Sequence, residues 1–157
     1  RLLPAGWAVP ARVFAAPSRS HDAVLVSDAR GTRHAVWTER AGRGRSERIL
    51  HATSRDGVTW SPPRDVVPAS ADVDYYAPRL GVDAQGRLHL AFLSSGRSAV
   101  VPETVVLEGN RWSAPRPLAP GAAASTLDLE MMDDGRGTLH ALWRGTDGRF
   151  RHSRLPR

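Results

Sequence analysis

Three Asp and three His residues that could perform acid–base or metal chemistry recur in the sequence at one spacing. The pattern Asp-x-x-Gly-x-x-His-x-x-aromatic occurs three times, with Asp28 and His34, Asp83 and His89, and Asp134 and His140. Carboxylate and imidazole groups are common general acids and bases, and both bind metals. Each copy supplies only one Asp, however, whereas Ca²⁺ takes six to eight oxygen ligands. We therefore predict that Asp-x-x-Gly is a β-turn, that each His bonds to neighbouring backbone, and that no metal or cofactor is bound.

Residues that differ among the three copies are better candidates for ligand binding. When the turn aspartates are aligned, Arg79 falls at the position of Val24 and Glu130. Tyr75 and Tyr76, the two tyrosines of the chain, come at the start of the apolar segment that contains Arg79. A cleft lined by such groups suits a polar ligand such as a sugar, and a solvated rim without a ligand is the alternative. The candidate ligand-binding residues are Arg79, Glu130, Tyr75, Tyr76, His21, Asp22 and Asp128.

The elements that must position these residues repeat with a period of about 52 residues. One aromatic series, each member followed three residues later by Pro, consists of Trp7, Trp60 and Trp112. The other closes the Asp–Gly–His pattern and consists of Trp37, Phe92 and Trp143. Short apolar runs and glycine turns at such a period, without a helical pattern, favour an all-β fold, the β-propeller.

Each blade of the propeller is expected to contain four strands. The predicted inner strands are 23–27, 76–82 and 127–132, and the second strands are 33–38, 88–93 and 138–143. The third strands are 48–53, 103–107 and 150–155, and the outer strands are 60–67 and 112–118. Proline in the outer strands is typical of sheet edges. Because side chains alternate along a strand, the aromatic residues of the Asp–Gly–His pattern should pack between blades as core, opposite the His residues. The tryptophans of the outer strands are expected to pack between blades in the same way, with stacking on a sugar as the alternative.

We expect one propeller unit with three four-stranded blades. Residues 1–14 would form an outer closing strand, 15–67 blade 1, 68–118 blade 2, and 119–157 blade 3 without its outer strand. Joining the end of the chain to its start continues the Trp spacing of about 52 residues, so the N-terminal segment is expected to complete a last blade. Three blades cannot close around an axis, since propellers typically have four to eight. The expected partner is a second copy in a six-bladed homodimer, or further blades of the same polypeptide.

The segment 54–60, Ser-Arg-Asp-Gly-Val-Thr-Trp, is predicted to be a tight hairpin, because Asp-Gly between apolar runs favours one. It resembles the Asp box of the sialidase-like β-propellers, Ser-x-Asp-x-Gly-x-Thr-Trp, with one residue fewer between Asp and Gly. The resemblance implies a propeller fold and an extracellular or cell-envelope location. It also implies a structural role for Ser54, Asp56, Gly57, Thr59 and Trp60.

Catalytic members of the sialidase-like family hold a carboxylate with three arginines and use a Tyr nucleophile, a Glu and an Asp. Here Arg79 is the only arginine in the predicted inner strands, and Ala77-Pro78-Arg79-Leu80 has the wrong order for the family's Arg-Ile-Pro motif. We therefore assign no catalytic residue. The expected function is a non-catalytic module that binds carbohydrate or another polar ligand at the channel mouth. The alternative is a sialidase-like glycoside hydrolase whose remaining catalytic groups come from other blades.

The composition of the chain argues against several other classes of protein. The 157 residues carry a net charge of +6, and every basic residue is arginine. The arginines are spread over all three repeats without a matching aromatic series for base stacking, so we expect no nucleic-acid partner. Retention on an anionic nucleic-acid column at roughly physiological salt would revive that weaker alternative. The absence of Cys excludes disulfides. The sequence contains no run of 18 apolar residues, so no membrane-spanning segment is predicted.

Overall fold

The computed structural model describes residues 12–13, 19–40 and 47–155, which form twelve strands and no helix. The predicted all-β class is thus confirmed for this part of the chain. It contains no helix long and apolar enough to cross a membrane. The predicted closing strand around Trp7 lies outside the described residues.

The first strand group is a four-stranded antiparallel sheet with the order β1-β2-β3-β4. Its strands are β1 (Arg19–Ser27), β2 (Arg33–Arg40), β3 (Glu47–Ser54) and β4 (Arg64–Asp65). Strands β1 to β3 are adjacent in the chain and in the sheet, as expected when short turns join antiparallel neighbours.

The second and third strand groups together form one eight-stranded sheet. The second comprises β5 (Asp74–Val82), β6 (Leu88–Ser95), β7 (Val100–Glu108), β8 (Arg111–Trp112) and β9 (Arg116–Pro117). The third comprises β10 (Ala124–Asp133), β11 (Leu139–Gly145) and β12 (Phe150–Arg154). Pairing of Ala124 with Val100 links the two groups. The pairing therefore differs from the predicted three separate four-stranded blades.

The predicted outer strands are much shorter in the structure. In place of a strand over 60–67 there is only the two-residue β4, and in place of 112–118 there are β8 and β9. Pro62 and Pro63 precede β4, and Pro115 lies between β8 and β9. Because proline has no N–H to donate to a ladder, it interrupts pairing at these positions.

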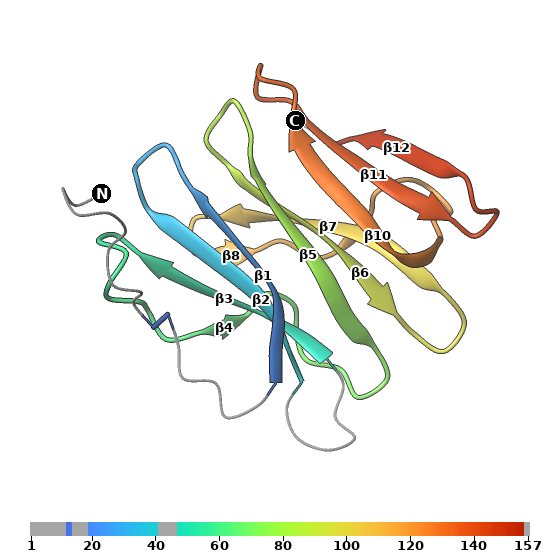
Figure 1. The fold of residues 1–157 in the computed structure, drawn as a ribbon, viewed down its shortest axis with the longest axis horizontal. Coiled ribbons are helices and arrows are strands. Elements are labelled where there is room, and N and C mark those ends of the chain that lie inside the picture. The colour runs from blue at the N-terminus through green and yellow to red at the C-terminus, as the bar shows by residue number, and fades with distance from the viewer. Residues whose placement is uncertain (1–11, 14–18, 41–46, 156–157) are drawn as a thin grey trace, which may run out of the picture.

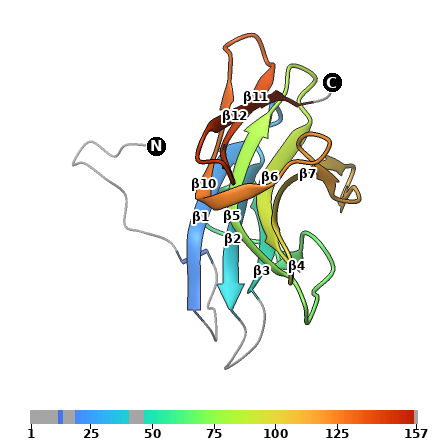
Figure 2. The same ribbon diagram turned by 90° about the vertical axis from the view of Figure 1, so that its right-hand side faces the viewer.

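The inner strands β1, β5 and β10 lie in this order across the molecule (Figure 1). Figure 2 shows that successive strands of the first two groups step away from the side on which β1 and β10 lie. The turns at the ends of β5 and β10 also meet, because Ala84 donates its N–H to the Gly137 carbonyl at 3.0 Å. A Cβ at Gly137 would collide with Ala84, and Gly137 has a positive φ of 74°, so the contact requires glycine.

The hydrophobic core lies between the groups. Val36 and Ile49 of the first group pack with Phe92 of the second, and Leu93 of the second packs with Trp143 of the third. Trp37, Phe92 and Trp143 are buried, with exposed fractions of 6, 0 and 3%. Phe92 and Trp143 pack between groups as predicted, whereas Trp37 packs against Leu50 and Trp60 of its own group.

The outer-strand tryptophans are only partly buried, which differs from the predicted core role. Trp60 packs against Trp37 and Leu50 of its own strand group. Trp112 packs between groups as predicted, and its ring centroid lies 5.3 Å from that of His51 in an edge-to-face arrangement.

Candidate functional site

The recurring Asp-x-x-Gly segments are turns, as predicted. The Asp83 Oδ1 atom accepts hydrogen bonds from the N–H groups of Gln85 and Arg87, both at 2.9 Å. Asp28 and Asp134 make the same pair of bonds in their own turns. In the described part of the chain, no group of three or more His, Cys, Asp or Glu side chains could hold a metal ion.

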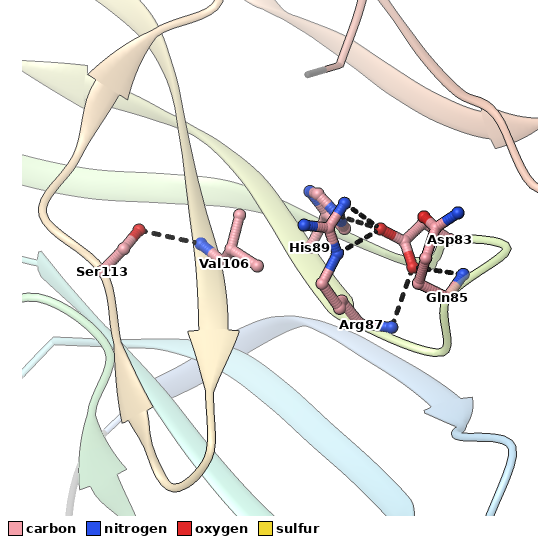
Figure 3. Close-up of polar contacts among 6 residues, drawn as sticks. All are labelled: Asp83, Gln85, Arg87, His89, Val106 and Ser113. Carbon is pink, nitrogen blue, oxygen red and sulfur yellow. Dashed lines mark hydrogen bonds and ion pairs between the residues drawn. The ribbon is translucent and has the colours of Figure 1, made fainter. Parts of the chain in front are cut away.

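The recurring His residues bond to side chains, so the prediction of backbone partners is wrong. His89, only 2% exposed, lies with its Nε2 atom 2.9 Å from Asp83 Oδ2, which Arg87 also contacts (Figure 3). Burial alone would raise the pKa of Asp83, but the hydrogen bonds from His89 and Arg87 outweigh it and lower the pKa to about 2. This aspartate is a buried, fully engaged anion and not a free acid or base.

In the first and third groups, the recurring His also contacts a second His. His34 Nδ1 lies 3.0 Å from His51 Nε2, and His140 Nδ1 lies 2.8 Å from His152 Nε2. Both pairs are stacked. Burial, and to a smaller extent the neighbouring His34, lower the pKa of His51 to about 4. These pairs join the second strand of a group to its third strand and have a structural role.

The inner strands share an irregularity that the repeat pattern did not predict. The strand register shifts between His21 and Val24 in β1, and between Tyr76 and Arg79 in β5. A third shift lies between residues 124 and 129 of β10. Asp22 and Ala77, at equivalent positions, both have a φ of +52°. Positive φ is uncommon outside glycine, and β-bulges concentrate beside functional sites, where they redirect side chains.

Arg79 and Glu130, two of the predicted site residues, meet across β5 and β10. Arg79 donates two hydrogen bonds to the Glu130 carboxylate, at 3.0 and 3.1 Å. The side chains remain 26 and 71% exposed. This forked pair therefore presents both donors and acceptors to solvent at the junction of two inner strands.

His21 and Asp22 also lie together, in company with a residue that the sequence did not single out. His21 Nδ1 is 3.2 Å from Asp22, and its Nε2 is 3.4 Å from Glu47. Glu47 in turn receives Arg40 at 3.6 Å, and its N–H donates to Asp74 at 2.7 Å. The sequence does contain a signal for Glu47. It is a charged residue at the start of an apolar run, and it pairs with Arg40 at the end of the preceding strand.

The remaining predicted residues divide into packing and surface groups. The Tyr75 and Phe92 rings pack edge to face with their centroids 5.9 Å apart, and burial raises the pKa of Tyr75. Tyr76 is half-buried against the core between the second and third groups, and burial raises its pKa too. Asp128 is exposed, 3.9 Å from Arg144. The structure thus unites Arg79 with Glu130 and His21 with Asp22, while Tyr75 belongs to the core.

The segment 54–60 is a structural turn between β3 and β4, as predicted. Asp56 accepts from the N–H groups of Val58 and Thr59 at 2.8 and 2.7 Å, and the Ser54 hydroxyl binds both Asp56 and the Gly57 N–H. The bonds from Thr59, Val58 and Ser54 hold the pKa of Asp56 well below its usual range. In Figure 2, β4 lies on the far side of the sheet from β1, so this turn is away from the inner strands.

No family model and no curated protein matches the sequence. Similar solved structures include an α-L-arabinanase from Penicillium chrysogenum, with a TM-score of 0.62 and 9% identity over 89% of this chain and 46% of that one. An endo-arabinase from Bacteroides thetaiotaomicron has a TM-score of 0.60 and 13% identity, with 95 and 60% covered. A fucose lectin from Kordia zhangzhouensis has a TM-score of 0.50 and 13% identity, with 85 and 91% covered.

These similarities establish a propeller-like fold and nothing finer. The chain spans about half the length of the two arabinanases. The hydrolases among the similar structures are β-propeller glycoside hydrolases and not sialidases. The expectation of a propeller is thus supported, whereas membership of the sialidase-like Asp-box family is not.

Proposed function

We propose that this chain is a carbohydrate-binding β-propeller module whose ligand lies over the inner strands. The observation that carries the proposal is the Arg79–Glu130 pair, which joins β5 to β10 and remains open to solvent. A guanidinium offers several N–H donors and a carboxylate offers only acceptors. Adjacent sugar hydroxyls both accept and donate, so they can bond to the two groups at once.

The bulges support this location. Those of β1 and β5 lie at equivalent positions, just before Val24 and Arg79, and that of β10 lies between residues 124 and 129, ahead of Glu130. The pairing register is therefore interrupted in three neighbouring strands, close to the Arg79–Glu130 pair. Asp22 and Asp128 lie within the interrupted stretches of β1 and β10. The site is therefore built from residues that differ among the repeats.

The test is a glycan array on the folded protein, followed by calorimetric titration with the best ligand. Arg79→Ala should weaken binding at least tenfold, about 1.4 kcal/mol. Arg97→Ala is the matched control, since it removes an exposed Arg–Asp pair elsewhere, with side chains 86 and 65% exposed. Equal binding by both variants and the unchanged protein would refute the proposed site.

A glycoside hydrolase, or part of one, is the second candidate, favoured by the placement of His21 between the carboxylates of Asp22 and Glu47. Glycosidases generally use two carboxylic acids, one as acid and one as nucleophile or base. Chromogenic arabinosides and sialosides test this directly. Turnover that Glu47→Gln abolishes and Arg97→Ala preserves would replace the binding proposal with catalysis.

We further propose that the three strand groups are three blades of a propeller, the third of which takes its outer strand from elsewhere, and that they form half of a six-bladed ring. Positions 36, 91 and 142 are equivalent, and Val36 and Ala91 are fully buried whereas Leu142 is 43% exposed. Met132 and Phe150, also in the third group, are 67 and 65% exposed. These exposed apolar side chains share one sheet face with polar residues such as Glu130, Arg144 and His152. Apolar side chains gathered on an open sheet face invite a partner.

The proposed partner for this face is a second copy of the chain, and further blades on the same polypeptide are the rival. Light scattering should give the mass of a dimer. Leu142→Asp should convert the dimer to monomer, whereas Val58→Asp, which alters an even more exposed apolar side chain in the β3–β4 turn, should not. A soluble, folded monomer of the unchanged chain would refute the dimer.

A further inference from the structure

Strand β12 has one edge to which no strand of the described residues pairs, because its only partner there is β11. In the first two groups the corresponding edge is occupied. Val66, just after β4, donates its N–H to the Ile49 carbonyl, and Leu118, just after β9, donates to Pro102, both at 2.9 Å. Within the part of the chain that the structure describes, the third group therefore lacks the outer strand that the other two groups carry.

The backbone groups at this edge of β12 are oriented for pairing. Leu155 donates its N–H to the Leu139 carbonyl of β11, so every second residue back from Leu155 bonds towards β11. The N–H and C=O groups of Phe150, His152 and Arg154 accordingly point away from β11. An edge of this kind is a template for a strand from another chain.

The side chains beside this edge are more exposed than their counterparts. In the first group Val36, Ile49 and Val66 belong to one buried cluster and are 0, 0 and 5% exposed. By strand register the first two correspond to Leu142 and Phe150 of the third group, which are 43 and 65% exposed. The residue that corresponds to Val66 is missing from the third group.

The sequence supplies a residue that matches Val66 in type and position. Val66 and Leu118 each come six residues after a Trp of the Trp-x-x-Pro series, and Val13 comes six residues after Trp7. Val66 and Leu118 are 5 and 8% exposed, whereas Val13 is 39% exposed. Val13 is thus an apolar residue at the outer-strand position that remains exposed, unlike its two counterparts.

The order of the chain indicates which group the segment 7–13 completes. Strand β4 is followed by β5 of the next group, and β9 by β10, so each outer strand precedes the inner strand of the following group. The segment 7–13 precedes β1 in the same way. In Figure 1, residues 12–13 lie on the side of the first group, whereas β12 lies at the other side of the molecule. The β12 that this segment reaches therefore belongs to a second copy of the chain.

We propose that residues 7–13 of one copy form the outer strand along β12 of a second copy, with Val13 covering Leu142 and Phe150. The exchange is reciprocal, so each copy completes the third group of the other. The inference rests on the dimer proposed above and adds the segment that is exchanged and the register in which it pairs. One contact then buries both the open strand edge and the exposed apolar side chains beside it.

The register follows from the first group, where Leu50 pairs with Asp65. The equivalent pair at the exchanged strand is Arg151 with Arg12. Like charges directly opposite each other are unfavourable, but Asp147 contacts Arg151 at 2.6 Å and balances its charge. The pair is of the non-hydrogen-bonded type, with Cα atoms about 4.5 Å apart, which is within reach of a disulfide.

The experiment uses paired cysteines, which report cleanly because the native chain has none. After mild oxidation, the double variant Arg12→Cys/Arg151→Cys should migrate on a non-reducing gel with the mass of two chains. The pair Arg12→Cys/Arg154→Cys is the register control, because three residues along the strand exceed the reach of a disulfide. That control and each single variant should give no covalent dimer.

The outcomes separate the strand exchange from the dimer itself. Light scattering that shows a dimer, together with no crosslink between positions 12 and 151, would overturn the exchange and leave the dimer standing. A crosslink formed within one chain would overturn the exchange between copies. A folded monomer of the unchanged chain would overturn both proposals and favour further blades on the same polypeptide.

A second variant tests the apolar part of the contact. Val13→Asp should raise the dissociation constant of the dimer at least tenfold, measured by analytical ultracentrifugation, because the carboxylate would enter the site beside Leu142. The variant should fold normally, since Val13 is already exposed. Val58→Asp is the matched control and should leave the dissociation constant unchanged. A Val13→Asp chain that dimerises as tightly as the unchanged chain would contradict the proposed contact.

Discussion

Asp83–His89 and Arg79–Glu130 are two polar pairs of opposite character, although Arg79 and Asp83 lie close together in the chain. The first pair is buried, with side chains 7 and 2% exposed, and it recurs in every repeat. The second lies between strand groups, is 26 and 71% exposed, and has no copy elsewhere. Residues that are identical in all three repeats stabilise the fold. Residues that differ among the repeats at one equivalent position are the ones we propose for ligand binding.

The third copy of the turn shows what a neighbouring strand group contributes. Asp134 and His140 occupy the same positions as Asp83 and His89, but their side chains are 33 and 28% exposed and lie 3.8 Å apart. The second group is covered by the third, while the outer face of the third is open. The Asp and His side chains of this motif are therefore buried and in close contact where another strand group covers them, and exposed and farther apart where none does.

Substitution of the recurring His should give the largest effect and separate these two environments. His89→Ala leaves a buried aspartate without one of its partners and creates a cavity, so it should lower the free energy of unfolding by about 2–4 kcal/mol. His140→Ala is the matched control and should cost much less. Urea denaturation measures both, and equal losses would show that covering by the next group is irrelevant.

The His34–His51 pair should make stability depend on pH. The folded pKa of His51, about 4, is below its ordinary value of 6.5, so the fold favours neutral imidazole. The stabilisation is complete above pH 6.5 and is lost as the pH falls towards 4, by about 3 kcal/mol in total. Unfolding measured across this range should show a slope that His51→Gln reduces, and an unchanged slope would contradict the assignment.

Arg79→Ala should affect ligand affinity and leave stability nearly unchanged, the opposite of what is expected for His89→Ala. Exposed ion pairs contribute about 0–1 kcal/mol to stability, so the melting temperature should barely change. Ligand affinity should nevertheless fall at least tenfold. A variant that unfolds readily yet retains full affinity when folded would move Arg79 from the binding site to the scaffold.

The smallest effect is expected at the β3–β4 turn. Asp56→Ala removes bonds to the N–H groups of Val58 and Thr59, which are local and exposed, so a small drop in melting temperature should follow. Binding should not change, because the turn lies away from the inner strands. Loss of binding without a change in the melting temperature would instead assign the turn to the site.

The sequence predicted regular features well because each has a local cause. The Asp-x-x-Gly turns, the strand cores and the buried aromatic series follow from turn chemistry and alternation. The bulges were missed because Asp22 and Ala77 adopt positive φ without being glycine. Glu47 and His51 were missed because their partners, His21 and His34, lie on other strands. Such contacts depend on register, which the pattern of a single strand does not specify.

The central claim is that ligand binding belongs to the varied residues of the inner strands. The most direct measurement is a map of backbone amide shifts, recorded by NMR as the best glycan from the array is added. The account predicts that the largest shifts fall on Asp22, Arg79 and Glu130, with the turns at Gly31, Gly86 and Gly137 unaffected. Shifts concentrated at those three turns, with the inner-strand residues unmoved, would contradict it.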